Sequence, residues 1–153
     1  MCGSIRYHAA MKPHRIMQVV GPRRSSQMNK KVAEWLKQAD YDMDTAQFMA
    51  KGGRHFYAVS MCHLAIEKAF KGLYERTLRE TPPKTHNLIF LLDKIGLKPD
   101  PDKGKTITRI NEASVGTRYP EDIDEMQRKY TQDITSRLLT QTQEILEWIK
   151  KQF

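Results

Sequence analysis

Apolar residues recur at spacings of three, four and seven along most of the chain, as the buried face of a helix requires. The first such stretch begins at Asn29, a favourable helix N-cap, and stops at the glycine pair 52–53. The second covers about residues 54–80, and two prolines follow it. These stretches predict two long amphipathic helices joined by a very short turn.

Three further segments also have a helical pattern. A short helix is predicted over residues 85–96, a weaker one over residues 105–113, and a long final helix from about Thr131 to the end of the chain. No segment alternates apolar and polar residues as a half-buried strand does. The sequence therefore predicts an all-α fold, an antiparallel up-and-down bundle of four to five helices.

Residues 1–27 lack this periodicity. They contain five basic residues and no acidic one, together with Pro13 and Pro22. Two interpretations are open: an irregular basic N-terminal arm, or a leader that is not native to a protein starting at Met28. We assign residues 28–153 to the bundle. Of the net charge of +8 for the whole chain, only +3 belongs to that part, because it holds 21 basic and 18 acidic residues.

Several classes of protein find no support in the sequence. No apolar run approaches the ~18 residues of a membrane-spanning helix, and the N-terminus lacks the apolar core of a secretory signal, so we expect no membrane association and a cytoplasmic location. Cys2 and Cys62 form neither a disulfide framework nor a metal-binding spacing. Phosphate-binding and dinucleotide-binding glycine motifs are absent. We therefore expect no metal and no cofactor.

Four short motifs follow one another in order along the predicted helices. They consist of Trp35, Ala39 and Asp42; Ala65, Glu67, Lys68, Ala69 and Lys71; Thr85, His86 and Leu88; and Arg118, Tyr119 and Pro120. This order resembles the HEPN family, the higher-eukaryote and prokaryote nucleotide-binding helical domain, over residues 30–152. The resemblance implies an antiparallel helical bundle that usually forms a homodimer and is often encoded beside a minimal nucleotidyltransferase.

Many HEPN relatives are RNA-cleaving toxins, and their motif is Arg-x4-6-His, an arginine followed a few residues later by a histidine. No histidine follows Arg118 in this chain, because His86 is the last one. The chain therefore resembles the Arg-Tyr-Pro branch without the ribonuclease motif, and the resemblance does not indicate an enzyme. If it is one, a ribonuclease is expected, with Arg118 and Tyr119 as catalytic candidates.

Polar residues form a strip on the second predicted helix. At 100° per residue, His63, Glu67 and Lys71 fall on one side, together with Ser60 and Tyr74. One interpretation is a solvated face, on which a Glu67–Lys71 pair is worth only ~0.3–0.5 kcal/mol. The other is a groove in which Lys71 and Arg118 hold phosphate oxygens while His63 or Glu67 orients a base or ribose.

The segment around Arg118 also has two interpretations. Arg118 is suited to bind a phosphate and Tyr119 to stack on a base, at the start of a late helix. Alternatively, Arg118 forms an ion pair with one of the acids in residues 121–125, and Tyr119 anchors the loop by packing. For His86 we expect a structural role, its ring bonding a backbone group near a helix N-terminus.

Three functional hypotheses follow from these observations. The first is a dimeric HEPN-type domain that binds a nucleotide or RNA phosphate in a polar groove and pairs with a minimal nucleotidyltransferase in a toxin–antitoxin-like module. Its ligand-binding residues are His63, Glu67, Lys71, Arg118 and Tyr119. The second is an active, metal-independent ribonuclease toxin in which Arg118 and Tyr119, with Glu121 or a residue of a partner subunit, replace the missing histidine. The third is a purely structural bundle that binds a partner.

Overall fold

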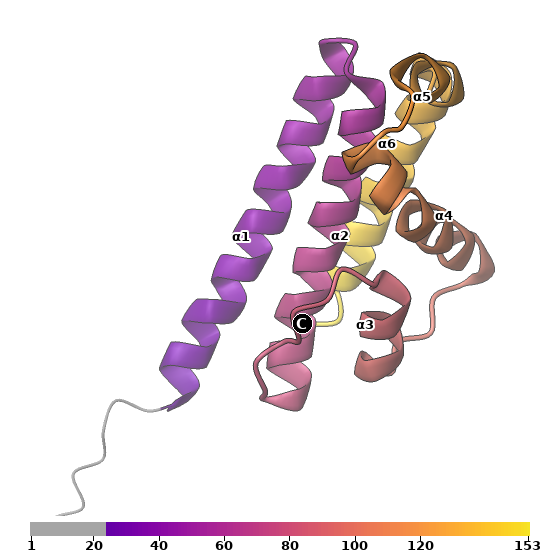
Figure 1. Ribbon diagram of the computed structural model, residues 1–153. Helices are drawn as coiled ribbons and strands as arrows, with labels where there is room; N and C mark the ends of the chain where they lie inside the picture. Colours follow the sequence, from indigo (N-terminus) through magenta and orange to yellow (C-terminus); the bar gives the residue numbers. More distant parts are fainter. Residues whose placement is uncertain (1–23) are drawn as a thin grey trace, which may run out of the picture.

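The computed structural model describes residues 24–153, which form six α-helices (Figure 1). In chain order these are α1 (Arg24–Lys51), α2 (His55–Leu78), α3 (Leu88–Ile95), α4 (Pro101–Arg118), α5 (Ile123–Lys129) and α6 (Gln132–Lys150). Within that described range there is no strand, which confirms the all-α prediction. Residues 1–23, most of the predicted arm, lie outside the described residues. Because α1 begins at Arg24, Asn29 lies inside the helix and is not its N-cap.

The first two helices form an antiparallel hairpin. Gly53 adopts a φ of 74°, a left-handed conformation that costs glycine little, and the Arg54 amide closes the turn by donating to the Met49 carbonyl at 2.8 Å. The helices approach closely near the other end of α2, where a Cβ atom on Gly72 would lie 3.0 Å from the Trp35 Cβ. Glycine at position 72 therefore permits the close contact.

Helix α2 is the centre of the molecule and contacts all five other helices (Figure 1). Helix α6 runs parallel to α2. Thr142, in the middle of α6, bonds Cys62 in the first half of α2, and Phe153, just after α6, packs near Gly72 toward the end of α2. The largest fully buried apolar side chains come from α2, α3, α4 and α6: Ile66, Phe70, Leu73, Leu88, Leu91, Ile107, Ile110, Leu138, Ile145, Leu146 and Ile149. Burial of each contributes roughly 1.5–3 kcal/mol.

The middle of the chain is more helical than the pattern predicts. Helix α4 starts earlier than expected because Asp100 accepts from the Lys103 amide at 2.9 Å and Pro101 occupies the first turn. Helix α5, capped by Asp122, has no buried residue, so no apolar period marks it in the sequence. None of the described helices is both long and apolar enough to span a membrane.

Two hydrogen bonds fix the linker between α2 and α3. The Leu88 amide donates to Asn111 Oδ1 of α4 at 2.8 Å, and the Asn87 side chain caps α3 by accepting from the Phe90 amide at 3.1 Å. The linker is thereby held between α2 and α4. His86, just before α3, is placed over the polar strip of α2.

A cluster of charged side chains between α2, the linker and α4

The polar strip of α2 is buried. His63 is fully buried where the α2–α3 linker and the end of α4 contact it, and Ser60, Glu67 and Lys71 are nearly buried. The solvated-face interpretation is therefore wrong. Polar side chains at such depth require partners, since an unpaired buried charge costs several kcal/mol.

His63 is hydrogen-bonded through both ring nitrogens. Its Nδ1 lies 2.9 Å from Arg118 Nη2, and a guanidinium only donates, so Nδ1 accepts. The proton then sits on Nε2, which donates to the His86 carbonyl at 2.9 Å. Burial, followed by the Arg118 charge, lowers the pKa of His63 from 6.5 to about 4. The ring is therefore neutral at pH 7.

Glu67 lies at the centre of the charges. Its Oε1 accepts from Lys71 Nζ at 2.7 Å, and its Oε2 lies 2.9 Å from His86 Nδ1 and 4.0 Å from Arg118 Nη2. Burial tends to raise the pKa of Glu67, but the hydrogen bonds and charges of Lys71 and His86 outweigh it, so the pKa falls below 4.5. Glu67 is therefore ionised at neutral pH, and Lys71 balances its charge.

His86 is the member of this site that the sequence does not reveal. Its ring bonds the Glu67 carboxylate rather than a backbone group, so that part of the structural prediction is wrong. The side chain is 66% exposed. His86 and Glu67 come from separate segments, and only the folded linker brings them together; the Thr-His step in the third motif was the one available signal.

Arg118 reaches the cluster from the last turn of α4, so the expectation that it lies at the start of a late helix is wrong. Its side chain is 23% exposed, and among residues 24–153 it contacts His63 and Glu67 rather than the acids of residues 121–125. The predicted ion pair with that segment is therefore wrong. Tyr119 is 77% exposed, which excludes a packed loop anchor. The structure thus joins His63, Glu67, Lys71 and Arg118 with His86 in one polar cluster and leaves Tyr119 outside it. Ligand binding by these residues stays a prediction.

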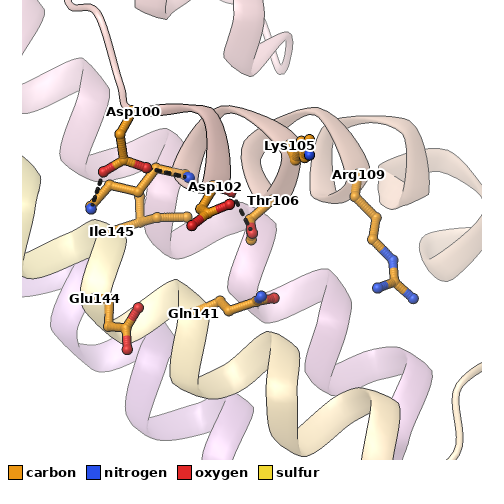
Figure 2. A pocket seen from close by; sticks show the side chains of 9 residues that line it. Asp100, Asp102, Lys105, Thr106, Arg109, Gln141, Glu144 and Ile145 are labelled. Atoms are coloured by element: carbon orange, nitrogen blue, oxygen red, sulfur yellow. Dashed lines mark hydrogen bonds and ion pairs between the residues drawn. The ribbon is translucent and has the colours of Figure 1, made fainter.

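A pocket of about 440 Å³ lies elsewhere, between α4 and α6 (Figure 2). Acidic and basic side chains both line it, and Asp100 bonds Lys103 at its edge. It shares no residue with the polar cluster. Across residues 24–153, no three His, Cys, Asp or Glu side chains group as metal ligands.

The fold and the cluster define a helical bundle built around one central helix that carries buried charges. The family model of the HEPN domain matches residues 32–152, and the chain belongs to this family, as the four motifs predicted. No curated protein matches the chain.

Two solved structures share the fold. One is TT1696 from Thermus thermophilus, with 25% identity and a TM-score of 0.66, covering 80% of this chain and 98% of that chain. The other is ST0689, described as an archaeal HEPN homologue, with 26% identity and a TM-score of 0.64, covering 80% of this chain and 97% of that chain. The family and the bundle are thus established.

Proposed function

We propose that this HEPN domain binds the phosphate of a nucleotide or RNA through its polar cluster. The observation that carries the proposal is the charge left on Arg118. Its nearest partner, His63, is neutral. The Glu67 carboxylate pairs with Lys71 at 2.7 Å, whereas Arg118 lies 4.0 Å from it, so Lys71 rather than Arg118 balances the charge of Glu67. A guanidinium has five N–H donors, and Nη2 alone is engaged among the described residues. The others suit a phosphate.

Replacing Arg118 with alanine is expected to weaken binding of a short fluorescein-labelled RNA by about tenfold or more. A hydrogen bond to a charged group contributes roughly 1.5–3 kcal/mol, which converts to at least that factor. Fluorescence anisotropy titration at fixed low salt measures the change.

The matched control for this titration is Arg109→Ala, which removes the same charge from an exposed position on the same helix. It is expected to change affinity little. Equal affinity of wild type and Arg118→Ala, or equal loss in both variants, would show that the cluster does not hold the phosphate.

The proposal also includes the association of this chain with a second copy and with a partner protein, and the family resemblance supports it. We expect a homodimer that works in the cytoplasm and pairs with a minimal nucleotidyltransferase in a toxin–antitoxin-like module. Val115, Tyr119 and Ile123 are exposed large hydrophobic residues in the segment where α4 ends and α5 begins, called here the α4–α5 corner. Such a corner is suited to burial against another chain, next to Arg118.

A ribonuclease is the second candidate, and the pairing of Glu67 with His86 favours it. An imidazole that acts as a general base is commonly oriented by a carboxylate bonded to its other nitrogen, as Glu67 is bonded to His86 Nδ1. Arg118 lies 4.0 Å from the same carboxylate oxygen. This candidate predicts that the wild-type protein cleaves a structured RNA in the presence of a chelator, and that His86→Ala and Arg118→Ala do not. Intact RNA in all three lanes of a gel would exclude it.

A further inference from the structure

We propose that His86 makes the polar cluster selective for ribose over deoxyribose. Its Nε2 accepts a hydrogen bond from a 2′-hydroxyl of a nucleic acid whose phosphate Arg118 holds. This inference rests on the proposed phosphate-binding function. It adds a specificity-determining residue and identifies the sugar that the site selects.

The position of one proton makes His86 an acceptor. His86 Nδ1 lies 2.9 Å from Glu67 Oε2, and an ionised carboxylate only accepts. The single proton of a neutral imidazole is therefore held on Nδ1, and Nε2 carries a lone pair. Among residues 24–153, Nε2 has no hydrogen-bond partner, and the side chain is 66% exposed.

The acceptor is also held in place. Besides the ring contact with Glu67, the His86 carbonyl accepts from His63 Nε2 at 2.9 Å. The nearby Leu88 amide is tied to Asn111 of α4 at 2.8 Å. Because both the ring and its backbone are fixed, a ligand loses little freedom when it bonds there, which favours a selective contact.

The two neighbouring groups recognise different parts of a ribonucleotide. Arg118 Nη2 and His86 Nδ1 lie within 4.0 Å of the same Glu67 oxygen, so the guanidinium and the imidazole are close neighbours. Phosphate oxygens only accept, so they match Arg118 and are repelled by the lone pair on His86. A hydroxyl donates, so it matches His86. Deoxyribose has no 2′-hydroxyl to donate to this acceptor, and the loss of that hydrogen bond weakens binding.

The test compares three fluorescein-labelled oligonucleotides of one sequence: RNA, DNA built with deoxyuridine, and 2′-O-methyl RNA. The full chain is titrated into each of them at about pH 8.5 and at one fixed low salt concentration. We expect RNA to bind about five- to tenfold more tightly than DNA. The 2′-O-methyl RNA is expected to bind like DNA, because it keeps an RNA-like backbone but has no hydroxyl proton to donate.

His86→Phe tests the residue itself, since it keeps a flat ring without nitrogen atoms. The ratio of RNA affinity to DNA affinity is expected to fall to about one, because the acceptor for the 2′-hydroxyl is removed. The matched control, His55→Phe at the start of α2, should retain the selectivity.

The outcomes separate this inference from the function on which it rests. Equal binding of RNA and DNA by wild type, or unchanged selectivity in His86→Phe, overturns the role of His86 and leaves the phosphate site standing. A uniform loss for all three oligonucleotides in His86→Phe also overturns it, because the ratio of RNA affinity to DNA affinity is then unchanged. Absence of binding to any of the three overturns both proposals.

Discussion

Replacing Glu67 with alanine is expected to lower the free energy of unfolding by roughly 3–5 kcal/mol, which corresponds to a fall in Tm of about 10 °C for a domain of this size. The Glu67 side chain is 4% exposed and that of Lys71 11%. Without the carboxylate, the Lys71 ammonium stays in a nearly dry position with no opposite charge, and the His86 ring loses its partner. Urea denaturation followed by circular dichroism measures the loss.

Two further variants show whether the pairing causes the loss. Glu144→Ala removes an exposed glutamate of α6 and should change stability by no more than about 0.5 kcal/mol. The double variant Glu67→Ala, Lys71→Met removes both charges and is expected to regain part of the stability that the single variant loses. Lys71→Met alone completes the cycle. A loss below about 1 kcal/mol in Glu67→Ala would contradict a buried stabilising pair, and so would a loss in the double variant that equals or exceeds the sum of the losses in the two single variants.

The protein is expected to lose stability between about pH 6.5 and pH 4 because of His63. The pKa of His63 falls from 6.5 to about 4 in the folded protein, so over this range the unfolded chain binds a proton that the folded chain excludes. The contribution of His63 is therefore complete above pH 6.5 and disappears as the pH falls through about 4. At about 1.4 kcal/mol for each pH unit, the loss amounts to about 3 kcal/mol. Urea midpoints at a series of pH values measure it.

The variant that isolates this effect is His63→Gln. Its amide keeps an acceptor for Arg118 and a donor for the His86 carbonyl, but it does not titrate. The dependence between about pH 6.5 and pH 4.5 should disappear in this variant and persist in His55→Gln. Since the pKa of Glu67 lies below 4.5, its contribution is lost at lower pH. Equal slopes for wild type and His63→Gln would refute the assignment.

Much of the fold can be predicted from apolar spacing alone. Helices α1, α2 and α6 each bury a continuous apolar stripe, and glycine, proline and Thr131 mark their ends. The extent of α4 and the presence of α5 could not be predicted in this way. The early start of α4 depends on capping by Asp100, and α5 buries nothing, so neither the first turns of α4 nor α5 produces a periodic signal.

The site was predictable only in part, because its members meet through tertiary contacts. Helical geometry places His63, Glu67 and Lys71 on one side of α2, and the motif order singles out Arg118. The burial of this side of α2 and the contact of His86 with Glu67 depend on how the α2–α3 linker folds between α2 and α4. The contacts of Glu67 with His86 and Arg118 could therefore not be derived from spacing along one helix.

The central position of α2 has a consequence for how the domain opens. Every other helix packs against α2, so its backbone amides become accessible to solvent only when the whole bundle comes apart. Helix α5, which has no buried residue, can open by itself. In hydrogen exchange the slowest protons should therefore belong to α2, and those of α5 should exchange faster.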